Sequence, residues 1–170
     1  MHHHQLHLLY TKMALRGQLK DAVVIGAPAD KVYEFYTRKP YEMKKSSPGK
    51  ILGVDLTEGQ WGKDGSVYCW NCVLDGKTVY LKGKVGIDDI NKSASHKEVE
   101  GHLMNSFKSF IISIQVIPNL EKGCSVLWTF DYEKVNVNVE DPTSLLQFVV
   151  DCCKDVGVYL NPMAPQLQTN

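Results

Sequence analysis

The sequence predicts an α+β domain in which a curved, seven-stranded antiparallel sheet wraps around one long C-terminal helix. Three observations predict it. Most of the chain alternates apolar and polar residues with a period of two, which is typical of half-buried strands. Turn-forming residues interrupt this alternation repeatedly, and the period becomes helical over a long stretch only near the C-terminus. Because the only long helix comes last, the sheet must wrap around it to bury the apolar faces of both.

The N-terminal part of this fold is predicted to hold one strand and two short helices. Residues 15–25 alternate like a strand and end at a Gly-Ala-Pro turn. Pro28 and Asp30 then favour a helix start, because proline fits a first turn and an acidic side chain interacts favourably with the helix dipole. Pro40 and the Ser-Ser-Pro-Gly cluster at residues 46–49 confine a second helix to the few residues between them.

Short strands separated by turn residues fill the middle of the chain. Asp75-Gly76 is a strong hairpin signal, because both central positions of such a turn need positive φ. The strands are predicted near residues 51–56, 66–74, 78–87, 95–103, 107–117 and 126–132.

The closing element has the period of a helix. Residues 141–144 supply an N-cap and a proline for its first turn, and Pro162 ends it. We expect residues 1–12 to be an extension outside the fold, residues 13–161 to form the domain, and residues 162–170 to be a tail. The apolar positions that repeat at helical spacing are Leu145, Val149, Cys152 and Val156.

Charge and hydropathy exclude several classes of partner. Lys+Arg and Asp+Glu both total 19, and no basic patch typical of nucleic-acid binding stands out. No apolar run is long enough to span a membrane, and the first dozen residues lack the apolar stretch of a signal peptide. We therefore expect a cytoplasmic monomer or weak dimer without nucleic-acid or integral membrane association.

The five cysteines do not form a recognisable metal or redox site. Cys69 and Cys72 have the C-x-x-C spacing, but a strand through them would point their thiols to opposite faces. Cys152 and Cys153 are adjacent, which suits no common structural-zinc pattern. An odd number of cysteines without a secretory signal favours reduced thiols. We expect no metal and no cofactor.

The strand alternation predicts three apolar walls rich in aromatic residues, and the C-terminal helix adds a fourth. A concave apolar surface with a few polar anchors is what a small-molecule site requires. The same stripes could instead fill a packed core, and composition alone leaves both interpretations open. The candidate ligand-binding residues are Tyr68, Trp70, Cys72, Phe110, Ile112, Ile114, Trp128, Phe130, Tyr132, Leu145, Val149, Cys152 and Val156.

Catalysis in such an interior needs a titratable group held against a substrate proton, with a pKa shifted by burial. His102 and Lys108 are weak catalytic candidates. Alternation places Lys108 on the side of Phe110, at the mouth of an interior space or extending out of it. His96 and His102 lie in polar contexts typical of the surface, and Asp131 is expected to face solvent. No set of nucleophile, base and orienting group can be assembled from the spacing.

Several blocks of the sequence resemble the major latex proteins of plants, a branch of the Bet v I superfamily of pollen allergens, pathogenesis-related proteins and hormone-binding relatives. The blocks occur in the family's order, cover roughly residues 13–160 and are specific when taken together. They are Gly17-Gln18-Leu19, residues 53–62 (GVDLTEGQWG), residues 70–77 (WNCVLDGK), residues 100–104 (EGHLM) with 107–110 (FKSF), and residues 132–136 (YEKVN) before Asp141-Pro142.

The resemblance implies a START-like helix-grip fold with a sizeable apolar cavity between sheet and helix. It also implies binding of hydrophobic or amphipathic small molecules and an association with defence and stress responses. A few relatives in alkaloid pathways are enzymes within that cavity. The sequence departs from the family at His102, where relatives usually have an acidic residue, and at Asn105-Ser106, where a Lys-Glu or Lys-Asp pair is common.

Three functions follow as hypotheses. The first is an intracellular carrier for a small hydrophobic ligand (a lipid, a steroid or a plant metabolite) in defence or stress. The second is an isomerase or condensing enzyme of alkaloid-type metabolism that uses the same cavity. The third is an interaction protein whose ligand gates a partner, and Trp61 in its glycine-flanked loop is the feature that favours it.

Overall fold

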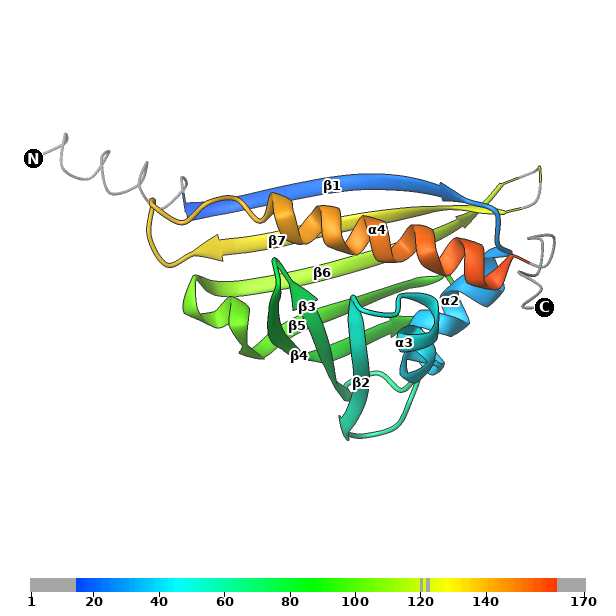
Figure 1. Ribbon diagram of the computed structural model, residues 1–170, viewed down its shortest axis with the longest axis horizontal. Helices are drawn as coiled ribbons and strands as arrows, with labels where there is room; N and C mark the ends of the chain where they lie inside the picture. The colour runs from blue at the N-terminus through cyan, green and yellow to red at the C-terminus, as the bar shows by residue number, and fades with distance from the viewer. Residues whose placement is uncertain (1–14, 120, 122, 162–170) are drawn as a thin grey trace, which may run out of the picture.

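The computed structural model describes residues 15–119, 121 and 123–161, which contain one antiparallel sheet in the strand order β1-β7-β6-β5-β4-β3-β2 (Figure 1). The predicted extension over residues 1–12 and the predicted tail over residues 162–170 lie outside the described residues. The strands are β1 (Arg16–Ile25), β2 (Ile51–Glu58), β3 (Val67–Leu74), β4 (Lys77–Asp88), β5 (Ser93–Gly101), β6 (Phe107–Pro118) and β7 (Cys124–Lys134).

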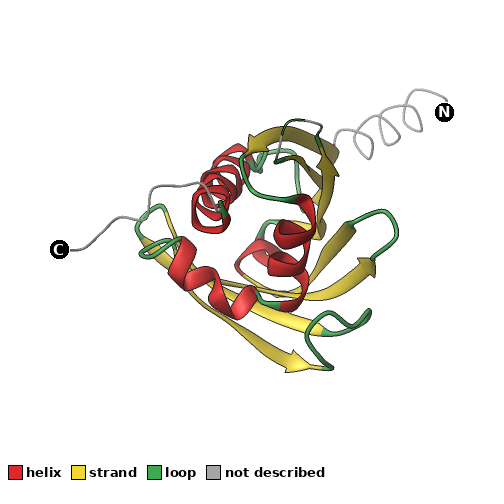
Figure 2. Ribbon diagram, turned by 90° about the vertical axis from the view of Figure 1, so that its right-hand side faces the viewer, coloured by secondary structure: helices red, strands yellow, loops and turns green. Residues whose placement is uncertain are grey.

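The sheet curves around its helices, as the end-on view in Figure 2 shows. The long helix α4 packs against β1 and also contacts α2 and α3. This arrangement confirms the predicted fold, a seven-stranded antiparallel sheet around a long C-terminal helix with short helices after the first strand. The helices are α2 (Ala29–Arg38), α3 (Met43–Ser46) and α4 (Thr143–Leu160), with 3-10 turns η1 (Pro40–Glu42) and η2 (His102–Asn105).

Local sequence signals set several element boundaries. Pro28 is the N-cap residue of α2, Asp30 lies in its first turn and Arg38 in its last, so both charges complement the helix dipole. In the turn between β3 and β4, Asp75 has φ 52° and Gly76 has φ 77°. These positive values confirm the predicted hairpin.

A β-bulge changes the predicted face of Lys108. The pairing of β6 with β7 shifts register between Phe107 and Ser109. As a result Phe107 and Phe110 are both buried, whereas Lys108 is exposed. The expectation that Lys108 shares the side of Phe110 is therefore wrong, because the bulge interrupts the alternation.

The start of α4 also differs from the expectation. Its N-cap residue is Pro142, and no side chain caps the first turn. The Asp141 carboxylate is engaged elsewhere, because it accepts a hydrogen bond of 2.7 Å from the Tyr132 hydroxyl and pairs with Lys134 at 3.0 Å. Asp141 therefore ties the loop before α4 to the end of β7.

The core has an aromatic end and an end that packs closely on the helix. At the end near η2, Phe110 contacts Phe107 and Phe130 with ring centroids 4.9 Å and 5.3 Å away. Toward the other end, a Cβ atom at Gly157 of α4 would lie 2.7 Å from Cβ of Ile25 in β1. The lack of a side chain at residue 157 therefore permits the close approach of α4 to the sheet.

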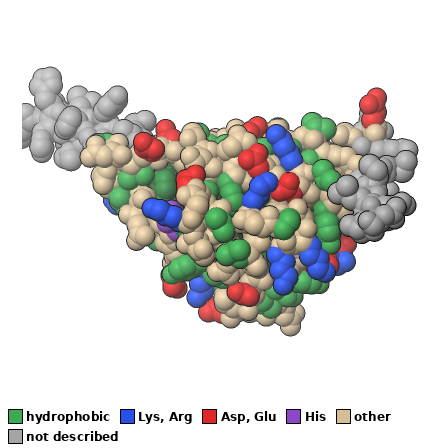
Figure 3. All heavy atoms as spheres, viewed as in Figure 1, with side chains coloured by type: hydrophobic (Ala, Val, Ile, Leu, Met, Phe, Trp, Pro, Cys, Tyr) green, Lys and Arg blue, Asp and Glu red, His purple; other side chains and the backbone are tan. Residues whose placement is uncertain are grey.

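The surface mixes charges of both signs. Figure 3 shows Lys or Arg and Asp or Glu side chains interspersed on the face that carries α4. The described ion pairs are largely solvent-exposed; Arg38 and Asp89, for example, lie 2.9 Å apart with side chains 39% and 56% exposed. Such pairs contribute little to stability.

Candidate functional site

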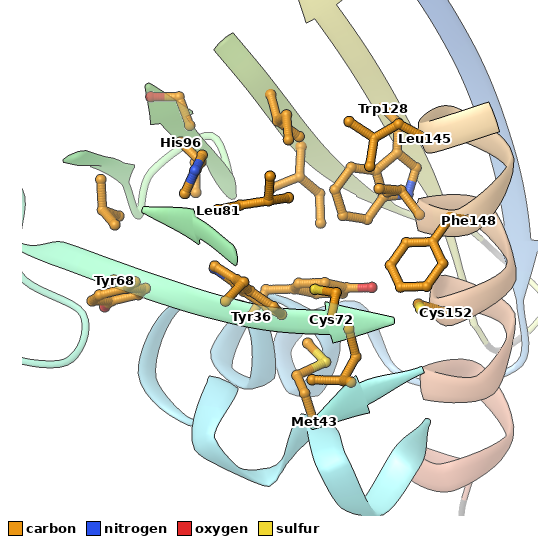
Figure 4. A pocket seen from close by; sticks show the side chains of 18 of the residues that line it. Tyr36, Met43, Tyr68, Cys72, Leu81, His96, Trp128, Leu145, Phe148 and Cys152 are labelled. Atoms are coloured by element: carbon orange, nitrogen blue, oxygen red, sulfur yellow. The ribbon is translucent and has the colours of Figure 1, made fainter. Parts of the chain in front are cut away.

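An internal pocket, called the inner pocket below, lies between the inner face of the sheet and helices α2, α3 and α4 (Figure 4). Its volume is about 120 Å³, and strands β2 to β7 all contribute to its wall. From α4, Leu145, Phe148, Val149 and Cys152 face the sheet across it. Its wall is therefore built by segments distant in the sequence.

Most of the candidate ligand-binding residues line the inner pocket. Phe110, Phe130 and Tyr132 do not, because they pack on one another and on Phe107 at the aromatic end of the core. Val156 is also outside the lining and is fully buried in the core. The candidates in the lining are Tyr68, Trp70, Cys72, Ile112, Ile114, Trp128, Leu145, Val149 and Cys152.

Other lining residues were not among the candidates. Leu81 and Val85 share one face of β4, so the same alternation that selected the other strands could have found them. The contributions of α2 and α3 depend on how the short helices dock, which no local pattern specifies. The lining residues that sequence analysis missed are Tyr36, Thr37, Met43, Ile51, Leu81, Val85, Ala94, Ser95, His96 and Phe148.

The Tyr68 hydroxyl anchors a neighbouring loop. It donates a hydrogen bond of 2.6 Å to the Thr37 carbonyl oxygen and accepts one of 2.6 Å from the Gly62 amide. Burial raises the pKa of Tyr68. The hydroxyl is therefore a structural link between α2 and the loop after β2.

Tyr36 and Trp128 place two further polar groups by α4. Their rings meet edge to face with centroids 5.3 Å apart. Burial raises the pKa of Tyr36 well above its ordinary value, and the next largest influence is the Cys153 thiol. Cys153 is in turn influenced by hydrogen bonding from both Trp128 and Tyr36. Within the described residues neither the Tyr36 hydroxyl nor Nε1 of Trp128 forms a hydrogen bond of standard geometry, and the sulfur atom near them is a weak acceptor.

His96 and Glu98 form a buried polar pair in β5. The register of β5 and β6 sets His96 opposite Ile112, on the inner face, so the expectation of a surface position for His96 is wrong. Its Nε2 lies 3.5 Å from Oε2 of Glu98, and the two side chains are 13% and 0% exposed. Burial raises the pKa of Glu98, although the adjacent imidazole opposes that shift.

The cysteines that face the inner pocket are unreactive in character. Burial raises the pKa of Cys72 to about 12 and that of Cys152 to about 11. Both thiols are therefore neutral at physiological pH, and the nucleophilic thiolate is scarce.

The weak catalytic candidates lie away from the inner pocket. His102 is exposed in η2 and Lys108 is exposed in β6. Asp131 accepts a hydrogen bond of 2.7 Å from Gln18 on the exposed surface. Trp61 packs between Tyr41 and Tyr68, with ring centroids 5.4 Å and 4.8 Å away.

The described residues offer neither a metal-binding cluster nor a membrane-spanning helix. In the described ranges, no group of three or more His, Cys, Asp or Glu residues could hold a metal ion. Within the same part of the chain, no helix is long and apolar enough to cross a membrane.

The fold and the inner pocket define a helix-grip protein. The model of the pathogenesis-related protein Bet v 1 family matches residues 14–162. The chain therefore belongs to the Bet v 1 family.

Its relatives include proteins of the major latex type, which confirms the resemblance. MLP-like protein 43 of Arabidopsis thaliana is 40% identical over 149 residues, 86% of this chain and 94% of that protein. MLP-like protein 28 of Arabidopsis thaliana is 37% identical over 158 residues, 92% of this chain; the chain spans 47% of the length of that protein.

Solved structures of other proteins have the same fold. The crystal structure of major latex-like protein 151 from Panax ginseng has a TM-score of 0.82 at 36% identity, covering 87% of this chain and 99% of that chain. Norcoclaurine synthase from Thalictrum flavum, solved in complex with dopamine and hydroxybenzaldehyde, has a TM-score of 0.65 at 14% identity, covering 89% of this chain and 92% of that chain. The second likeness is one of fold alone.

Proposed function

We propose that this protein binds and carries a small apolar or amphipathic molecule, such as a lipid, a steroid or a plant metabolite. The observation that carries the proposal is the inner pocket, whose wall combines aromatic and aliphatic side chains with few polar groups. This composition is usual for small-molecule sites. The pathogenesis-related family and the free cysteines support a role in defence or stress within the cytoplasm.

Binding is favoured over catalysis because the predicted catalytic candidates lie outside the inner pocket, and His96 in its lining is paired with Glu98 rather than with a nucleophile. His102 and Lys108 are exposed and do not line the inner pocket. The pocket-lining thiols Cys72 and Cys152 have pKa values raised by burial. A nucleophile activated by a neighbouring base is therefore not found among these groups.

A displacement titration tests the proposal. Anilinonaphthalene sulfonate, a fluorophore that brightens in apolar surroundings, is expected to bind the native protein near one equivalent. Fatty acids or sterols should displace it. If the fluorophore binds only after partial unfolding, as it does in molten globules, the pocket does not accept ligands and the proposal fails.

A further inference from the structure

A buried polar pair beside the inner pocket lacks a hydrogen-bond partner; His96 lines the pocket and Glu98 lies next to it. Nε2 of His96 and both carboxyl oxygens of Glu98 are buried, and none has a partner in hydrogen-bond geometry within the described part of the chain. The 3.5 Å separation of the two groups permits electrostatic attraction but not a well-formed hydrogen bond. Buried polar groups are normally hydrogen-bonded, so this pair needs an explanation.

The backbone of the neighbouring strand leaves room for the imidazole. Gly83 of β4 lies opposite Glu98 in the sheet, and a Cβ atom at residue 83 would collide with the His96 ring. The ring therefore occupies space that any other residue at position 83 would fill. Figure 4 shows His96 on the side of the pocket away from α4, which carries Leu145 and Phe148.

Other polar side chains of the pocket wall differ in whether they have a hydrogen-bond partner. The Tyr68 hydroxyl bonds to the backbone of Thr37 and Gly62. The Tyr36 hydroxyl and Nε1 of Trp128, in contrast, are also buried without a partner in hydrogen-bond geometry among the described residues, and the Cys153 sulfur near them is a weak acceptor. The His96–Glu98 pair differs from these two donors because its unpartnered atoms include the carboxyl oxygens, which are hydrogen-bond acceptors.

The pair is suited to a neutral partner. Burial raises the pKa of Glu98, because apolar surroundings disfavour its charged form. The carboxyl group and the imidazole both offer hydrogen-bonding atoms to a ligand. A charged group brought beside it would have to be desolvated in apolar surroundings, at a high cost.

We propose that the ligand is an amphiphile with a hydroxyl group, and that this hydroxyl bonds to the imidazole of His96 while Glu98 holds the ring from behind. The inference rests on the proposed function, since it assigns the polar end of a ligand in the same pocket. The apolar body of the ligand would extend from His96 toward Phe148 and Val149 of α4.

The test compares probes that differ only in the polar group: 1-decanol, decyl methyl ether and decylammonium. Each competes with anilinonaphthalene sulfonate on the full chain. The wild type is expected to bind decanol about fivefold more tightly than the ether, because one net hydrogen bond is gained. His96→Leu should remove this preference, and the matched variant His102→Leu, at an exposed histidine outside the pocket, should keep it.

The outcomes separate the two proposals. If no probe displaces the fluorophore and the fluorophore itself does not bind, the proposed function fails. If all probes bind but decanol and the ether bind equally, only the hydroxyl assignment fails. The hydroxyl assignment also fails if His96→Leu still prefers decanol to the ether, or if decylammonium binds most tightly of the three probes.

Folding of the variants is checked by their urea midpoints. Should His96→Leu not fold, Glu98→Leu tests the same pair, because it removes the unpartnered carboxyl group. The expected result is a reduced preference for decanol over the ether. An unchanged preference in a folded Glu98→Leu would mean that Glu98 does not support the contact.

Discussion

At the scale of single residues, Glu98 is the one buried acidic or basic residue in the described part of the chain. Glu98 is 4% exposed, and the other buried polar residues among those described are uncharged Thr and Ser. A carboxyl group in this position binds its proton more tightly in the folded than in the unfolded protein, since burial raises its pKa. Glu98 therefore links the stability of the fold to pH.

The sign of this dependence gives a prediction. With a raised folded pKa, the contribution of Glu98 to stability is fully present below its ordinary pKa and is lost as the pH rises through the folded value. Glu98→Gln should therefore gain stability relative to wild type between pH 4 and pH 8. Urea midpoints across this range measure it, with the exposed Glu100→Gln as the control. Parallel curves for wild type and Glu98→Gln would contradict the prediction.

A second residue-scale prediction uses neighbouring valines of α4. Val149 lines the inner pocket, whereas Val150 is buried in the core. Val149→Trp should fill the pocket and weaken fluorophore binding while costing less than about 1 kcal/mol. Val150→Trp should overpack the core and cost about 1–3 kcal/mol, with the pocket unfilled. Denaturant midpoints and dye affinity on both variants check it; equal destabilisation would mean that Val149 also meets a filled core.

At the scale of elements, the contact between α4 and β1 depends on a helical glycine. A side chain at Gly157 would approach Cβ and Cγ2 of Ile25 to 2.7 Å and 2.8 Å. Both are atoms of a buried β-branched residue, which has little freedom to move aside. Glycine at this position lowers the helix propensity of α4 but allows the helix to pack closely on β1.

Replacing this glycine should destabilise the protein. Gly157→Ala gains about 1 kcal/mol of helix propensity, but the collision with Ile25 costs about 1–3 kcal/mol, so a net loss is expected. Val158→Ala, at a position 69% exposed on the same helix, should change stability by less than about 0.5 kcal/mol. The urea midpoints of the two variants measure these changes in stability. A stabilised Gly157→Ala would show that Ile25 moves aside for the added methyl group.

The elements also show where sequence reasoning succeeds. Alternation correctly locates the inward faces of β3 and β7, and Asp75-Gly76 sets a hairpin from purely local chemistry. It fails at Lys108, because a bulge depends on the pairing of β6 with β7 and leaves no local signal. It misses His96 for a related reason, since only the register with β6 shows that this polar residue faces inward.

At the scale of the whole molecule, the inner pocket depends on long-range packing. Tyr36 and Met43 enter its wall through the docking of α2 and α3, which the sequence does not specify. Phe110 and Phe130 carry the same apolar signal as the lining residues, yet their rings pack on each other. The pattern of apolar faces is therefore local information, whereas the division between filled core and pocket is global.

The reactivity of the cysteine thiols measures how tightly this interior is packed. Cys69 is half-buried, whereas Cys72, Cys124, Cys152 and Cys153 are buried. Burial raises the pKa of all five thiols, and that of Cys124 reaches about 11. Ellman's reagent should therefore label at most one thiol rapidly in the native protein and all five in guanidinium chloride. Fast native labelling of several thiols would show that the interior opens readily, and Cys69→Ser should abolish the fast phase.

The way in which α4 is attached to the sheet has a consequence for selectivity. Among the described residues, no backbone hydrogen bond joins α4 to a strand; its contacts are side-chain packing, with Asp155 also bonded to Ser47 and Lys50 at 2.9 Å and 2.8 Å. A shift of the helix relative to the sheet would therefore break no backbone hydrogen bond between them. Under the proposed function, compliance of this kind would let one sequence accommodate molecules of different length and bulk. Shape alone would then discriminate poorly between them, and the polar end of the bound molecule would decide which one is retained.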